Sequence, residues 1–286
     1  AEGGQQAVMN YCIAKCEAGA FDEALPHLQN LSQSQSSELS SIASSLLSVI
    51  ATDAPKNFSN FNDNLKYQYL YFNRLTVRGE DAEKLVEEIK DPYQKLQAIS
   101  IWINLLNKEK NFSRVDSLYS NLNYDVTAQN SAIGEINYQY LLALVGSKSW
   151  KSLDVKSKKL FLNKDREKSR TFFKAFTQAG LGQVKQAQST YLLALKADPL
   201  NEQLVLEASS FFNANDQLEK AYNILLKGIQ INPYSVVLHK AYALQCLQLN
   251  LETYGDDTMN RLSLLLNPSE FNIFEKEYVA EKERLQ

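Results

Sequence analysis

The chain is poor in the residue types that most catalytic and metal sites use. Its 286 residues include three cysteines and two histidines. The short patterns of phosphate loops, dinucleotide-binding turns, zinc proteases and paired-cysteine redox centres do not occur in it. A nucleophile–histidine–acid set cannot be proposed, because His27 and His239 are far apart in the sequence and fall in different segments. We therefore expect no enzymatic activity, no cofactor, no catalytic residue and no bound metal.

The charge balance and the lack of long apolar runs narrow the range of partners. Lysine and arginine number 30 against 33 acidic residues, and the net charge is −3. No basic stripe is available to neutralise phosphates, so we do not expect a nucleic acid as partner. No apolar run approaches the roughly 18 residues of a membrane-spanning helix. The sequence predicts a soluble chain, either cytoplasmic or, if a leader has been removed from before Ala1, periplasmic or secreted.

The few cysteines do not form a convincing site. Cys12 and Cys16 lie four residues apart on an expected helix, so their thiols could share one face. A metal would need two further ligands, and a disulfide across a single helical turn is sterically awkward. We interpret both as small apolar residues of the core.

What the chain does have is a repeat between residues 168 and 268. Pro199, Pro233 and Pro268 are 34 and 35 residues apart, and each follows an apolar helix, a short polar break and a second apolar helix. Such a period predicts a solenoid of helix pairs. With each proline placed at position 32, positions 8, 20 and 27 tend to be small, as close helix crossings require. These positions hold Ala175, Ala187 and Ala194, then Ser209, Ala221 and Gly228, then Ala243, Gly255 and Leu262.

This pattern resembles the tetratricopeptide repeat (TPR) family. The shared features are the small residues at positions 8, 20 and 27, an aromatic or aliphatic residue at position 24 such as Tyr191, and the final proline. The chain departs from the family at positions 4 and 11, where the family prefers Trp and Tyr. The resemblance implies an all-α, right-handed superhelical solenoid of antiparallel helix pairs.

The repeat is expected to cover the chain unevenly. We predict degenerate helices over 1–91, regular repeats over 92–268 and a capping helix over 269–286, all in one continuous solenoid. The first region is irregular because its position-20 alanines, Ala24 and Ala82, are 58 residues apart and a serine-rich helix at 38–51 intervenes. An aromatic-rich helix is expected next, at 63–77.

The resemblance also implies where a partner would bind. In the TPR family the first helix of each pair lines a concave groove through positions 2, 5, 9 and 12. Carried over by position, the candidate partner-binding residues are Tyr138, Leu142, Phe172, Phe176, Leu206 and Asn213. The lysines and arginines with which some members grip a terminal carboxylate are missing. The aromatic residues have two interpretations, a groove for an apolar peptide or amphipathic helix, and a core between repeats.

The predicted function is therefore a non-catalytic scaffold or adaptor that binds a protein or peptide. The alternative is a structural assembly subunit, or a fragment of a larger chain, that associates with itself. The sequence leaves the oligomeric state open.

Overall fold

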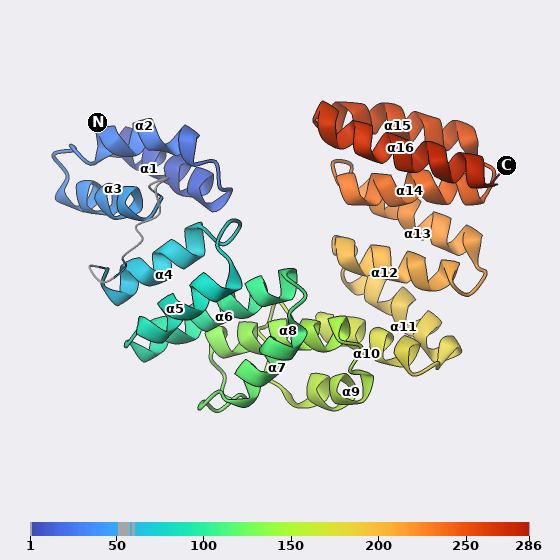
Figure 1. Cartoon of the computed structure of the whole chain (residues 1–286), viewed down its shortest axis with the longest axis horizontal. Helices are drawn as coiled ribbons and strands as arrows, with labels where there is room; N and C mark the ends of the chain where they lie inside the picture. Colours follow the sequence, from blue (N-terminus) through green and yellow to red (C-terminus); the bar gives the residue numbers. More distant parts are fainter. Residues whose placement is uncertain (1, 51–57, 59–60, 286) are drawn as a thin grey trace. The chain divides into compact units, whose positions relative to one another are not determined.

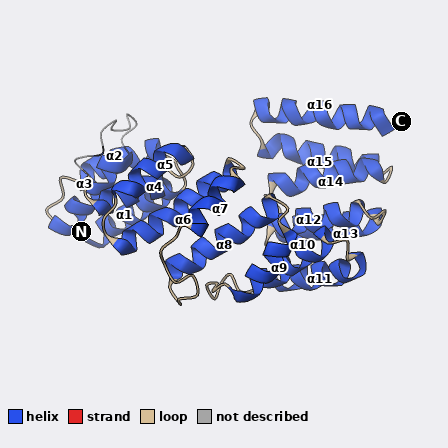
Figure 2. Ribbon diagram, turned by 60° about the horizontal axis from the view of Figure 1, so that its bottom comes forward, coloured by secondary structure: helices blue, strands red, loops and turns tan. Residues whose placement is uncertain are grey.

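The chain is built from helices. The computed structural model describes residues 2–50, 58 and 61–285, and over these ranges it contains sixteen α-helices and no strand (Figures 1 and 2). Helices account for 77% of these described residues. The prediction of an all-α helical solenoid is confirmed. None of the described helices is both long enough and apolar enough to cross a membrane.

Two compact units make up the chain, and they divide it at a different place from the predicted segments. Unit 1 comprises Ala1–Ser149 with Lys159–Asn163, and unit 2 comprises Trp150–Lys158 with Lys164–Gln286. The helices of unit 1 are α1 (Glu2–Glu17), α2 (Phe21–Leu31), α3 (Ser37–Ile50), α4 (Asp63–Phe72), α5 (Gly79–Glu88), α6 (Pro92–Lys108), α7 (Phe112–Ser120) and α8 (Ser131–Gly146). The helices of unit 2 are α9 (Trp150–Lys159), α10 (Ser169–Gly180), α11 (Val184–Ala197), α12 (Glu202–Asn213), α13 (Leu218–Ile231), α14 (Val236–Gln248), α15 (Glu252–Leu265) and α16 (Pro268–Leu285). The last residue of α9, Lys159, is assigned to unit 1.

One type of turn joins six pairs of consecutive helices along the chain. In each turn a residue has positive φ, which lets the chain reverse after the first helix. The next residue donates its backbone N–H to the carbonyl five residues earlier, at 2.8–2.9 Å, and so caps the helix end. The positive-φ residues are Gly19, Lys110, Lys148, Gly182, Asp216 and Asn250. The last four are spaced by 34 residues each, so the period of the prolines is also a period of backbone geometry.

The repeat positions predicted to be small or apolar lie inside the fold. The position-20 residues follow the positive-φ residues by five places, and all are buried: Ala24, Val115, Leu153, Ala187, Ala221 and Gly255. Within a unit, helices pack inside a pair, as α10 packs on α11, and between neighbouring pairs, as α11 packs on α12. This sequential packing is what distinguishes a solenoid from a globular bundle.

The N-terminal part is irregular, as expected. Helix α3 packs against α1, α2 and α4, but it does not belong to a helix pair joined by the turn described above. The helix predicted over 63–77 is too long, because α4 ends at Phe72. The side chain of Asn73 explains this end, since its amide donates to the backbone oxygens of Tyr69 and Val49, at 3.0 and 2.8 Å. The asparagine thus caps the last turn and ties it to α3.

A buried asparagine fixes the long segment after α7. Asn137 of α8 has no exposed surface. Its amide nitrogen donates to the backbone oxygens of Val126 and Phe161, at 2.7 and 2.9 Å, and its oxygen accepts from the Tyr119 hydroxyl at 2.6 Å. The Tyr119 ring in turn stacks on Tyr140 with centroids 3.7 Å apart. One α8 side chain therefore anchors three separate segments of unit 1.

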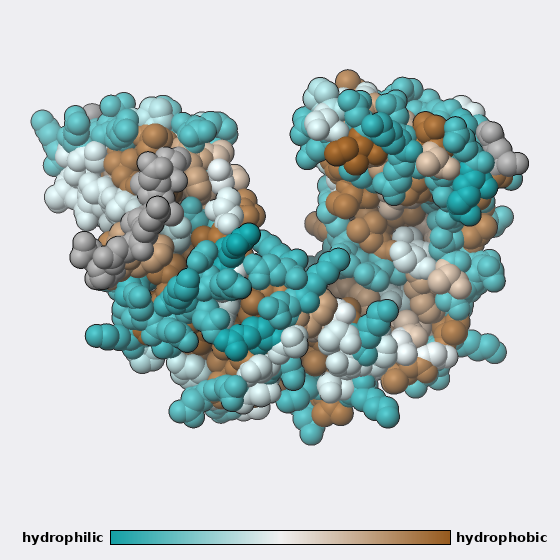
Figure 3. Space-filling model, in the orientation of Figure 1, coloured by the Kyte–Doolittle hydropathy of each residue, from teal (hydrophilic) through white to brown (hydrophobic). Residues whose placement is uncertain are grey.

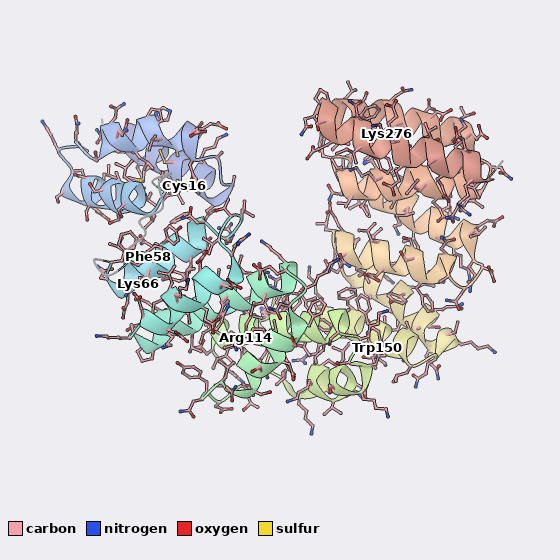
Figure 4. All side chains as sticks on the ribbon, viewed as in Figure 1. Cys16, Phe58, Lys66, Arg114, Trp150 and Lys276 are labelled. Carbon is pink, nitrogen blue, oxygen red and sulfur yellow. The ribbon has the colours of Figure 1, made fainter. Side chains whose placement is uncertain are left out.

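The cysteines lie in the core, as the sequence indicated. Cys12 and Cys16 of α1, the second shown in Figure 4, are fully buried free thiols, and so is Cys246 of α14. Burial raises the pKa of Cys16 and of Cys246 to about 11 each, because an apolar surrounding disfavours the thiolate. No cluster of three or more potential metal ligands occurs among the described residues.

The last helix covers the end of unit 2. Helix α16 packs on α14 and α15 and buries Phe274 and Tyr278. The Tyr278 hydroxyl donates to Asp256 at 2.9 Å, and Lys282 pairs with Glu252 at 2.9 Å. The opposite face is exposed and largely charged, for example at Lys276 (Figure 4). This arrangement fits the predicted role of a cap.

Candidate partner-binding groove

The six residues predicted from repeat positions do not form one exposed surface. Tyr138, Phe172 and Phe176 are buried, with 9%, 2% and 6% of their surface exposed. Leu142, Leu206 and Asn213 are partly exposed. Tyr138 and Leu142 belong to unit 1, and the other four residues belong to unit 2.

The phenylalanines of α10 belong to an aromatic core in unit 2. Phe172 and Phe176 meet edge to face with centroids 4.4 Å apart, and Phe176 lies 6.1 Å from Tyr191 of α11. Tyr191 then packs on Phe211 of α12, at 5.0 Å. Of the two interpretations of these rings, their burial favours the core. Aromatic residues at helical spacing satisfy both interpretations in a sequence, so periodicity alone could not separate them.

The structure shows a different apolar surface in unit 2, the α11–α13 groove. It is a depression of about 440 Å³ between the second helices of two consecutive pairs. Its walls come from α11, α13 and the turn after α11, and its floor includes one α12 residue. The lining residues are Leu192, Leu195, Lys196, Pro199, Val205, Asn223, Ile224, Lys227, Gly228 and Ile231.

A repeat glycine shapes the floor of the groove. Gly228 occupies position 27, where a side chain would collide with α12, the other helix of its own pair. A Cβ at this position would come within 2.8 Å of Cγ1 of Val205 and 3.3 Å of Cδ1 of Leu238. The glycine therefore lets α13 approach α12 and α14 closely, and the space outside it stays open between the rows of larger side chains.

The groove combines apolar walls with positive charge. Leu192 is 51% exposed, and its neighbours Leu193 and Leu200 are 62% and 65% exposed. Lys196 and Lys227 are exposed lining residues, whereas no aspartate or glutamate lines the groove. Neither lysine forms an ion pair with another described residue. An apolar surface with unbalanced lysines is complementary to an apolar segment that carries carboxylates.

A signal for this surface was present in the sequence. From the run Tyr191–Leu195, Tyr191 and Ala194 are buried and Leu195 is partly buried against the core. Leu192 and Leu193 are therefore apolar residues in excess of what packing requires. The family resemblance instead predicts a site on the first helix of each pair. Apolar side chains also reach other parts of the surface, as Figure 3 shows, so exposure alone would not have singled out the groove.

The two histidines do not contribute to a site with the groove. His239 is buried in α14, with Nδ1 2.7 Å from the backbone oxygen of Ser235. His27 is exposed on α2 in unit 1, and its ring packs edge to face on Tyr11.

Comparison with known proteins adds no relationship. No family model and no curated protein matches the chain.

Proposed function

We propose that the chain is a non-catalytic protein-interaction scaffold of TPR-like helix pairs. Its α11–α13 groove would bind an acidic amphipathic helix of a partner protein. The observation that carries the proposal is the groove itself, whose lining residues include the exposed Leu192, two lysines and no carboxylate. A partner helix would place apolar side chains at i, i+3 or i+4, and i+7 in the groove, with carboxylates beside the lysines.

The family part of the proposal is supported by the agreement of two independent periods. The buried small residues repeat every 34 residues in unit 2, and so do the positive-φ turn residues Lys148, Gly182, Asp216 and Asn250. TPR proteins share this length and this helix pairing. The chain's departures at positions 4 and 11 are filled by buried residues in the later repeats, including Val205, Phe212 and Cys246.

Selection from a display library of helical peptides tests the groove. We expect the wild-type chain to enrich peptides with an apolar stripe flanked by Asp and Glu. The double variant Leu192→Ser/Ile224→Ser removes two apolar lining residues and should weaken binding of a selected peptide about 10-fold or more, as loss of central apolar contacts does. Isothermal calorimetry on the purified peptide gives the affinities.

A matched double variant controls for surface changes of the same chemistry. Leu264 and Ile273 are 85% and 69% exposed in unit 2, and neither lines the groove. Leu264→Ser/Ile273→Ser should bind the selected peptide with wild-type affinity. Unchanged binding by the groove variant, or enrichment of peptides without acidic residues, would contradict the proposal. A mass in light scattering that rises with protein concentration would instead favour the self-associating assembly subunit.

A further inference from the structure

The positive charge of the chain is concentrated around the start of unit 2. From Lys148 to Lys185, eleven residues are lysine or arginine and three are aspartate or glutamate. The whole chain, in contrast, has 30 basic and 33 acidic residues. The net charge of −3 therefore conceals a strongly basic segment, and the expectation that no basic stripe is available is wrong for these residues.

Within unit 2, this charge lies on three neighbouring helices, α9, α10 and α11 (Figures 1 and 2). Trp150 at the start of α9, labelled in Figure 4, packs on Gly180 at the end of α10, where a Cβ would collide with the indole ring. Arg170 at the start of α10 donates a hydrogen bond to the backbone oxygen of Ser157 near the end of α9. The two helices are therefore tied together at both ends and run in opposite directions.

A depression of about 690 Å³ lies beside the turn between α10 and α11. No carboxylate and no aromatic ring is among its lining residues, which include two lysines. No side chain caps the start of α11 at Gln183, so the first backbone N–H groups of that helix remain available as donors. The lining residues are Lys174, Gln178, Gly182, Gln183, Val184, Lys185, Gln186, Ser189 and Thr190.

The repeat extends this basic surface to α9. Lys151 of α9 and Lys185 of α11 are 34 residues apart and both exposed, so they hold the same position on the second helices of consecutive pairs. Lys158 likewise stands 34 residues before Leu192, which lines the α11–α13 groove. Lysine thus replaces leucine at the equivalent position one repeat earlier. Five exposed lysines form what we term the basic stripe: Lys151, Lys158, Lys164, Lys174 and Lys185.

Most of the charge of the basic stripe is not neutralised by the chain itself. Lys158 pairs with Asp154 of the same helix, at 2.8 Å. The other four lysines of the stripe form no ion pair with another described residue. Like charges gathered on one surface repel one another and attract a polyanion from solution. The stripe therefore favours an anionic partner.

The composition of the surface distinguishes among anionic partners. The centres of protein–protein interfaces are apolar and depleted in lysine. A membrane-binding helix presents a broad apolar face, but α9 buries Leu153 and exposes only Val155 among its aliphatic residues. Interfaces with nucleic acids are polar and strongly basic. Lysine, amide and hydroxyl side chains and the N–H groups of a helix start are the groups that contact phosphates in them.

We propose that the basic stripe binds the phosphate backbone of a double-stranded nucleic acid without reading its sequence. A duplex fits better than a single strand, because single strands stack their bases on aromatic side chains and neither the stripe nor the depression has one. The lysines neutralise phosphates, and the uncapped start of α11 donates hydrogen bonds to them. The stripe shares no residue with the α11–α13 groove, so either proposal can fail without the other.

The test measures fluorescence anisotropy of labelled DNA and RNA duplexes of about 20 base pairs as the full chain is added at low salt, where we expect a Kd of about 10 μM or lower. The logarithm of the binding constant should fall with the logarithm of the salt concentration with a slope of about −3 to −5, because each neutralised phosphate contributes about −0.9. Two DNA duplexes of unrelated sequence should bind within about 2-fold of each other, since phosphate contacts carry no sequence information.

Matched variants connect the binding to the basic stripe. Lys151→Gln/Lys174→Gln/Lys185→Gln removes three unpaired charges of the stripe. It should weaken duplex binding about 10-fold or more at low salt and make the salt slope shallower by about 2 to 3, or about one for each lysine. The control Lys90→Gln/Lys220→Gln/Lys276→Gln removes the same total charge from exposed lysines outside the stripe, and it should bind like the wild type. Circular dichroism melting confirms that each variant is folded.

Four results would overturn the proposal. The first is no duplex binding at low salt, or binding that does not weaken as salt is added. The second is an equal loss in the stripe variant and its control, which would reduce the effect to total charge. The third is tighter binding to a single strand of the same sequence. The fourth is tighter binding to poly-L-glutamate or to phosphatidylserine vesicles than to the duplexes, which would assign the stripe to an acidic protein or a membrane.

Discussion

Asn137→Ala is expected to lower the free energy of unfolding of unit 1 by about 3 kcal/mol or more. The variant removes the acceptor of the Tyr119 hydroxyl and the donor for the backbone oxygens of Val126 and Phe161. Asn137 has no exposed surface, so water cannot replace these hydrogen bonds without opening the fold. Each buried group left unpaired costs about 1–3 kcal/mol, and a methyl group restores none of the bonds.

Urea unfolding measures this effect. The fluorescence of Trp102 reports on unit 1 when Trp150 is replaced by Phe, because Trp102 and Asn137 lie in the same unit. Asn64→Ala is the matched control, since Asn64 is exposed on α4 in that unit, and its effect should stay within about 0.5 kcal/mol. A loss below about 1 kcal/mol for Asn137→Ala would mean that its three hydrogen bonds do not hold the segment after α7.

Tyr191→Ala should destabilise unit 2 by about 3–5 kcal/mol, the usual loss for a buried aromatic residue reduced to alanine. Tyr191 is 2% exposed and packs between Phe176 of α10 and Phe211 of α12. The ring therefore joins two neighbouring helix pairs, and a solenoid depends on such contacts between repeats. Burial also raises the pKa of the Tyr191 hydroxyl, because the phenolate would lose its solvation.

The fluorescence of Trp150 in a Trp102→Phe background follows the unfolding of unit 2. Tyr191→Phe keeps the ring and should cost less than about 1.5 kcal/mol, as near-isosteric changes do. Tyr254→Ala removes the same side chain from a site that is 55% exposed in the same unit, and it should have a small effect. Equal losses for Tyr191→Ala and Tyr254→Ala would show that the aromatic core does not join the repeats.

The helix pairs could be predicted because the same pattern of small and apolar residues occurs several times in the sequence. Small residues such as Ala187 and Ala221 recur at the positions where helices cross closely. Because the pattern is repeated, a departure at one position in one repeat does not hide it. The end of α4 could not be predicted in this way. It depends on Asn73 reaching the backbone of Val49 in another helix, and that contact leaves no periodic trace.

The proposed binding surface was harder to predict, because it depends on apolar side chains that the core does not bury. Phe172 and Leu192 are both apolar residues on amphipathic helices, but the first is 2% exposed and the second 51%. Which of them faces solvent is decided by the neighbouring repeat, which a single-helix pattern does not contain.

The most direct test of the proposed partner-binding groove is a reversal of its charge. Lys196→Glu/Lys227→Glu replaces both lysines of the α11–α13 groove and leaves its apolar walls intact. At low ionic strength, where screening is weak, the wild type should bind a selected acidic peptide about 10-fold or more tightly than a counterpart with Lys in place of each Glu and Asp. The double variant should prefer the basic counterpart. An unchanged preference for the acidic peptide would contradict the account, because the carboxylates would then be recognised somewhere other than this groove.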